Sequence, residues 1–228
     1  MCLVFLGVGQ ITSGFDSEHP KSNSVSYELD ADTGKAIWIS ADRNLDEWTS
    51  QFFRGETRPA TFRGDVAFLS PGGLYEFDGL EGPAPAVSLP PPTAERLNDT
   101  TEGGTRALRL RVASPRGAQN AIVRVEAPGA IVTASIDGKE IGRDGVPEDI
   151  RDELTFSYAG IPKDGFELSL ATNSTGPVKV TVQDVWEGLP KVPGMQIESR
   201  PSWMIPLQVQ AMDPTKVKKS FVFEGEQK

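Results

Sequence analysis

Residues 106–114 read RALRLRVAS, a run in which apolar and basic side chains alternate along the chain. In an extended strand, successive side chains point to opposite faces of the sheet. One face would therefore be apolar and the other basic, with Leu108, Leu110 and Val112 on the first and Arg109 and Arg111 on the second. This pattern predicts a strand of antiparallel type that packs against a core on one side and faces water on the other.

The same alternation recurs on the C-terminal side of this run. It covers the segments NAIVRVEA (120–127), LTFSYAG (154–160), FELSLAT (166–172) and VKVTVQDV (178–185). Within residues 131–142, Asp137-Gly138 separates two apolar runs, which is a strong signal for a two-residue hairpin turn. Short strands at this spacing, with no helical pattern between them, predict an all-β fold, an antiparallel β-sandwich of jelly-roll or immunoglobulin-like type over residues 93–228.

Two further strands are predicted on the N-terminal side, SVSYELD (24–30) and AIWIS (36–40). Asp32-Thr33-Gly34 lies between them, and we expect a hairpin there because Asp and Gly tolerate the positive φ of a tight turn. Residues 43–53 are predicted to form the one short helix of the fold, since Leu45, Trp48 and Phe52 recur at helical spacing, with Asp42 or Asn44 as its N-cap.

Proline and glycine dominate the segment after this helix. Residues 54–92 are predicted as loop, ending in the proline-rich connector GLEGPAPAVSLPPP (79–92). The connector would separate residues 15–92 from the sandwich, or the two parts would form one continuous domain. The tail beyond Trp186 is expected to wrap the sandwich and to close with an edge strand at KKSFVFE (218–224).

Charge and composition argue against several classes of function. The formal net charge of -9 repels phosphate backbones, so nucleic acid is not expected as a partner. The single cysteine, Cys2, cannot form an internal disulfide. The single histidine, His19, excludes most histidine-based zinc sites and argues against a Ser-His-Asp triad.

The apolar start of the chain, MCLVFLGVG (1–9), has two interpretations. It is too short to cross a bilayer, which takes about 20 residues. It is therefore either a buried strand or the end of a transmembrane helix that begins outside this chain.

Asp32-Thr33-Gly34 is also the core of the aspartic-protease signature, and Asp30-x-Asp32-x-Gly34 opens many calcium loops. A protease would need a second such aspartate, and the sequence holds one Asp-Thr-Gly, followed by Lys35. A full calcium loop would need an oxygen ligand where Gly34 stands and a glutamate where Ala41 stands. A hairpin turn is the preferred interpretation, with weak calcium binding by Asp30, Asp32 and Asp42 as the alternative.

Three other groups of residues are weaker candidates. Asp16, Glu18 and His19 could ligate a metal, although an acidic loop is the simpler reading. The four tryptophans are candidate interaction residues, as core or interface anchors rather than a sugar-binding platform: Trp38, Trp48, Trp186 and Trp203. Asn98-Asp99-Thr100 and Asn173-Ser174-Thr175 match the glycosylation pattern, which matters in a eukaryotic secretory pathway.

Five segments, in order, resemble a known family. They are residues 15–53, TTEGGTRALRLRVASPRGA (100–118), TGPVKVTVQDVWEGLPKVPGM (175–195), RPSWMIP (200–206) and the D-x-T-x-V-x-x-SFVF pattern at 213–223. Together they are similar to the region after the last transmembrane helix in multi-pass membrane zinc exopeptidases related to the endoplasmic-reticulum metallopeptidase.

This resemblance implies a non-catalytic, extracytoplasmic accessory domain that covers or orients the peptidase domain or binds a partner. Residues 1–14 would be the remnant of the final transmembrane helix, so the N-terminus would lie near the membrane. The expected partners are the peptidase and membrane domains of the parent protein. Zinc would be bound by the parent's upstream domain, because no segment here matches its ligand motifs. The alternatives are a free-standing carbohydrate- or protein-binding sandwich and, from Asp32, a dimeric aspartic protease.

Overall fold

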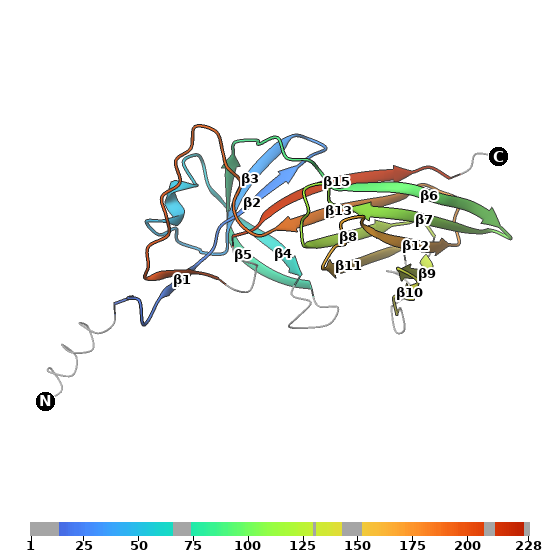
Figure 1. The fold of residues 1–228 in the computed structure, drawn as a ribbon, viewed down its shortest axis with the longest axis horizontal. Helices are drawn as coiled ribbons and strands as arrows, with labels where there is room; N and C mark the ends of the chain where they lie inside the picture. The colour runs from blue at the N-terminus through green and yellow to red at the C-terminus, as the bar shows by residue number, and fades with distance from the viewer. Residues whose placement is uncertain (1–13, 66–73, 130, 143–151, 208–212, 226–228) are drawn as a thin grey trace, which may run out of the picture.

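A computed structural model describes residues 14–65, 74–129, 131–142, 152–207 and 213–225. Apart from one short 3-10 helix, the regular structure of these residues is β (Figure 1). The strands are β1 Lys21–Asn23, β2 Ser26–Asp30, β3 Lys35–Ser40, β4 Arg58–Asp65, β5 Leu74–Ala84, β6 Thr93–Glu102, β7 Thr105–Ala113, β8 Asn120–Glu126, β9 Ile131–Ile136, β10 Lys139–Glu140, β11 Glu153–Ala159, β12 Phe166–Thr172, β13 Val178–Trp186, β14 Met204–Pro206 and β15 Thr215–Phe223.

Two sheets form the predicted β-sandwich. One has five strands in the order β10-β9-β12-β7-β6, and the other has eight in the order β11-β8-β13-β15-β2-β3-β5-β4. Alternate residues of β7 are buried, as the sequence predicts, and Leu108 lies opposite Leu170 on β12. The apolar inner faces of both sheets share one core, which includes Leu110, Val123 and Val182. The all-β sandwich expected from the alternating runs is thereby confirmed.

A second apolar core lies at the other end of the eight-stranded sheet, where β2 to β5 are grouped in Figure 1. Its centre is aromatic, with the ring of Trp38 5.1 Å from Tyr27 and 5.0 Å from Phe52. Strand β15 connects the two cores, because Val217 is buried in this one and Phe223 in the sandwich core. The eight-stranded sheet thus contains strands from both sides of the proline-rich connector.

The helix predicted for residues 43–53 is replaced by a 3-10 helix of three residues, Thr49–Gln51. The N-cap residue is Trp48, not Asp42 or Asn44, and the Asp46 carboxylate accepts the N–H groups of Trp48 and Thr49, at 3.1 and 2.8 Å. The helix is a single 3-10 turn, and the longer amphipathic face predicted for residues 43–53 does not form.

Three strand predictions were wrong. Residues 54–92 contain β4 and β5, and β6 was not predicted, because its residues beyond Ala94 are polar or exposed and carry no alternating signal. The strand at 218–224 is not an edge strand. It belongs to β15, which lies between β13 and β2 and runs parallel to β2. The lysines of β15 are typical of an edge strand. In the fold, Lys216 and Lys218 form ion pairs with residues of the neighbouring strand β2.

The interpretations of residues 1–9 and 1–14 as a strand or a helix remnant fall outside the described residues, apart from Gly14. Among the residues that the structure does describe, there is no helix with the length and apolar character needed to cross a bilayer.

Candidate functional site

Asp32-Thr33-Gly34 forms the predicted turn between β2 and β3, and Gly34 has a φ of 70°. The Asp30 carboxylate accepts the N–H groups of Asp32 and Thr33, at 2.9 and 3.2 Å. Burial alone would raise the pKa of Asp30, but the Lys218 ammonium and these two N–H groups outweigh it and lower the pKa. The Asp32 carboxylate accepts the Ser220 N–H of β15 at 2.9 Å. Both carboxylates therefore hold the hairpin and its neighbouring strand.

The other candidate ligands also bond locally. Asp42 accepts the Ser24 N–H at 3.0 Å, so it serves a different contact from Asp30 and Asp32. Asp16 accepts the N–H groups of Glu18 and His19, both at 2.8 Å, and these bonds lower its pKa. In the part of the chain that the structure describes, no three His, Cys, Asp or Glu side chains gather as a cation site.

The four tryptophans do not form one exposed patch. Trp38 and Trp48 are buried and contact the same ring, Phe52, at 5.0 and 5.1 Å. Trp203 is partly buried at the border of this core, whereas Trp186, at the end of β13, is 39% exposed and belongs to neither core. Trp38 and Trp48 therefore serve as core anchors that pack the hairpin against the 3-10 helix.

Sequence reasoning missed three polar clusters that are buried or partly buried. In the first, Arg200 donates to both carboxylate oxygens of Asp213, at 2.6 and 2.9 Å, and its guanidinium lies 4.0 Å above the Trp48 ring. It also donates to the side-chain oxygen of buried Asn23 at 2.9 Å, and Asn23 donates to Asp46 at 2.9 Å. This cluster ties β1, the 3-10 segment and the C-terminal tail together.

The second and third clusters lie in the sandwich. Fully buried Asp184 of β13 accepts hydrogen bonds from Ser114 and Arg116, and Arg116 also reaches the Thr215 carbonyl at 3.1 Å. At the opposite end, fully buried Arg106 of β7 forms an ion pair with Asp99 of β6. The sequence signal for Arg106 and Asp184 is their place in the alternation, since each falls on the core-facing side of its strand, where a charged residue is unusual.

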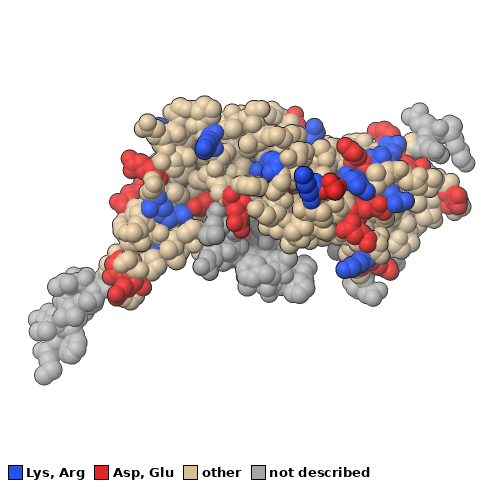
Figure 2. All heavy atoms as spheres, viewed as in Figure 1, with Lys and Arg blue, Asp and Glu red and all other residues tan. Residues whose placement is uncertain are grey.

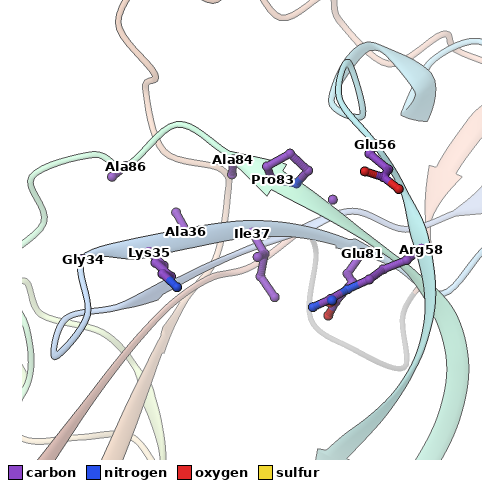
Figure 3. A pocket seen from close by; sticks show the side chains of 11 residues that line it. Gly34, Lys35, Ala36, Ile37, Glu56, Arg58, Glu81, Pro83, Ala84 and Ala86 are labelled. Carbon is purple, nitrogen blue, oxygen red and sulfur yellow. The ribbon is translucent and has the colours of Figure 1, made fainter.

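One open groove of the described residues combines apolar and charged walls. It has a volume of about 550 Å³ and lies along β3 and the end of β5 (Figure 3). Arg58 donates to the Glu81 carboxylate at one end, and Lys35 lies at the other. The wall between them is mainly apolar and includes Ile37, Pro83, Ala84 and Ala86.

A smaller hollow of about 290 Å³ continues the groove over β2, β15 and β13, and it shares Lys35 and Ile37 with it. Two lysines in this region are neutralised by the neighbouring strand, with Lys216 3.0 Å from Glu28 and Lys218 3.1 Å from Asp30. On the face shown in Figure 2, acidic and basic side chains are likewise interspersed rather than separated into fields.

Comparison with known proteins gives no match, either to a protein-family model or to a curated protein. The groove and the three polar clusters are therefore the features from which a role is inferred. The clusters can hold a fold together, and the groove can accept part of another molecule.

Proposed function

We propose that this chain is a non-catalytic extracytoplasmic accessory domain of a membrane-bound, zinc-dependent exopeptidase of aminopeptidase type. It would cover or orient the peptidase domain or bind a partner, with its N-terminus near the membrane. Zinc would be held by the parent's peptidase domain. The basis of the proposal is the resemblance carried by five ordered segments, together with what the polar residues of those segments do in the fold.

One observation carries the proposal: the buried polar residues of the five segments bond to one another. Asp184, from 175–195, is bonded to Ser114 and Arg116, from 100–118. Arg116 also binds the carbonyl of Thr215, from 213–223. The segments that carry the resemblance are thus joined by hydrogen bonds into one folded unit. An accessory domain has to fold as such a unit.

The cluster around Arg200 extends this argument to the other segments. Arg200 is bonded to Asn23, from 15–53, and to Asp213, from 213–223. Asp32, which the sequence offers as a catalytic candidate, and Asp30, which it offers as a calcium ligand, are bonded to backbone N–H groups of β15 and of the hairpin. Because these carboxylates serve the fold, the bonds fit a domain that supports catalysis carried out by another domain.

Two measurements test the proposal. The purified chain is incubated with aminopeptidase substrates and zinc, and we expect no turnover above buffer; zinc-dependent turnover that a chelator removes would contradict the accessory role. The same chain is titrated onto a separately purified zinc exopeptidase domain of the resembled family from the same genome. We expect saturable binding that an unrelated β-sandwich of similar charge does not show.

The groove favours a second candidate, a free-standing protein-binding sandwich, because an open groove can bind a segment of another protein without any further domain of the same chain. Binding to a protein other than the peptidase domain, with no affinity for that domain, would favour this candidate.

A further inference from the structure

We infer that the groove between Lys35 and Glu56 receives an extended segment of a partner protein with an acidic, an apolar and a basic side chain at alternate positions. This goes beyond the proposed function, because it names the surface and the chemistry of the segment. It applies whether the partner is a peptidase domain or another protein.

The spacing of the groove residues matches an extended chain. Lys35 and Ile37 are two residues apart on β3, and Glu81 on β5 lies opposite Ile39, two residues further on. Figure 3 shows the Lys35, Ile37 and Glu81 side chains on one side of the sheet. At about 3.3 Å per residue, Lys35 and the level of Glu81 are roughly 13 Å apart along the strand. Residues i, i+2 and i+4 of an extended peptide project from one face with the same spacing.

Each end of the groove carries one unpaired charge, and these two charges are opposite in sign. Lys35 is exposed, and its ammonium forms no ion pair with any side chain that the structure describes, unlike the neighbouring Lys216 and Lys218. At the other end, Glu56 is exposed and also has no ion-pair partner among the described residues, whereas Glu81 is paired with Arg58. An acidic side chain is therefore expected at Lys35 and a basic one near Glu56, because Arg58 already neutralises Glu81.

The middle of the groove selects an apolar side chain. Ile37 is half-buried, and Pro83, Ala84 and Ala86 complete an apolar wall that an aliphatic side chain can contact.

The test uses the intact chain and a fluorescein-labelled peptide with blocked ends, in which Asp, Leu and Lys occupy positions two, four and six between Gly and Thr residues. Fluorescence anisotropy at low salt measures its affinity. We expect saturable binding, and at least tenfold weaker binding when the peptide's Asp is replaced by Lys. Since Lys35→Glu makes both ends of the groove acidic, this variant should invert the preference and favour the peptide with two Lys residues.

Lys163→Glu is the matched control, because Lys163 is an exposed residue of the loop between β11 and β12. It introduces the same charge change away from the groove and should leave the peptide preference as in the parent chain. No binding of the Asp-Leu-Lys peptide, or equal effects of Lys35→Glu and Lys163→Glu, would overturn the inference. If the chain binds the peptidase domain but not the peptides, the groove inference fails and the accessory role stands. If the chain binds the peptides but not the peptidase domain, the groove inference stands and the proposed link to a zinc exopeptidase fails.

Discussion

Arg106 donates hydrogen bonds to both carboxylate oxygens of Asp99, at 2.8 Å each, from a side chain with no exposed surface. The same guanidinium donates to the carbonyls of Gly176, Phe223 and Glu224, at 2.6, 3.1 and 3.0 Å. This ion pair is the largest cause of the lowered pKa of Asp99. One residue of β7 therefore joins β6, the loop before β13 and the end of β15.

Replacing Arg106 by Leu should lower the free energy of unfolding by about 3–5 kcal/mol, because the buried Asp99 carboxylate and three carbonyls would lose their donor. Urea unfolding followed by tryptophan fluorescence measures this loss. Arg109→Leu is the control on the same strand, since Arg109 forms a similar two-point pair with Glu167 but is half exposed. The control should change stability little. Equal losses for the two variants would refute a structural role specific to the buried pair.

Asp46 gives the fold a specific acid sensitivity. Burial alone would raise its pKa, but hydrogen bonds from Thr49, Asn23 and Lys21 outweigh burial and lower the pKa to about 2. An unfolded Asp titrates near about 3.9. Because the folded pKa is the lower one, the carboxylate stabilises the fold fully above about pH 4, and this contribution is lost as the pH falls through about 2.

Asp46→Asn should therefore cost about 2 kcal/mol at pH 7 and progressively less towards pH 2. Unfolding free energies of the parent and the variant, measured from pH 2 to 7, give this difference directly. Asp164→Asn, at an exposed loop residue, is the control and should give a nearly constant difference. A difference for Asp46→Asn that is independent of pH would contradict the assignment.

The sequence predicted those parts of the fold that depend on neighbouring residues. The Asp137-Gly138 turn forms as expected, with φ angles of 48° and 78°, because the local backbone conformation requires these residue types. Arg106 shows the limit of such reasoning. It continues the alternation of β7 on the core face, and its partners Gly176 and Phe223 lie 70 and 117 residues further along the chain. The role of a charged residue on the apolar face of a strand can be assigned only when its partners in the folded chain are known.

The candidate site was beyond prediction for the same reason. Lys35 follows the hairpin turn, Glu56 precedes β4, and Glu81 lies on β5, a strand whose Gly and Pro residues indicate a loop. Pro83 is accommodated in β5 because pairing with β4 ends at Glu81, so its missing N–H is not needed on that side. The pairing of β3 with β5 creates the groove, and no local pattern encodes it.

Gly79 allows β5 to approach the chain that leaves β3. A Cβ at this position would lie 2.2 Å from the Ser40 carbonyl oxygen, which is too close for any side chain. Gly79→Ala should therefore destabilise the protein by about 1–3 kcal/mol, as overpacking does. Gly142→Ala is the control, since a Cβ there has no atom within 4 Å. Thermal unfolding of the two variants decides the point, and a neutral Gly79→Ala would show that the two segments can separate at little cost.

Asp32 should act as a structural residue. Its carboxylate accepts the Ser220 N–H, so Asp32→Ala is expected to lower stability by about 1 kcal/mol or less, since the bond is exposed to water. Hydrogen exchange at the Ser220 amide reports this contact, and the amide should exchange faster in the variant. Thr33→Ala changes the adjacent turn residue and should leave that amide protected. Loss of an acid-pH proteolytic activity in Asp32→Ala would instead support the aspartic-protease alternative.

Trp48 and Trp186 should respond differently to the same substitution. The Trp48 indole donates to the Glu198 carbonyl at 2.8 Å and stacks under Arg200, so Trp48→Phe removes a buried hydrogen bond and part of a cation–π contact. We expect a loss of about 1–3 kcal/mol, measured by urea unfolding with circular dichroism. Trp186→Phe, at a residue 39% exposed, should leave stability nearly unchanged. If Trp186→Phe were the more damaging change, the β13 end would be a structural contact. Loss of glycan binding in the Trp186 variant would support the carbohydrate-binding alternative, because Trp48 is too buried to reach a sugar.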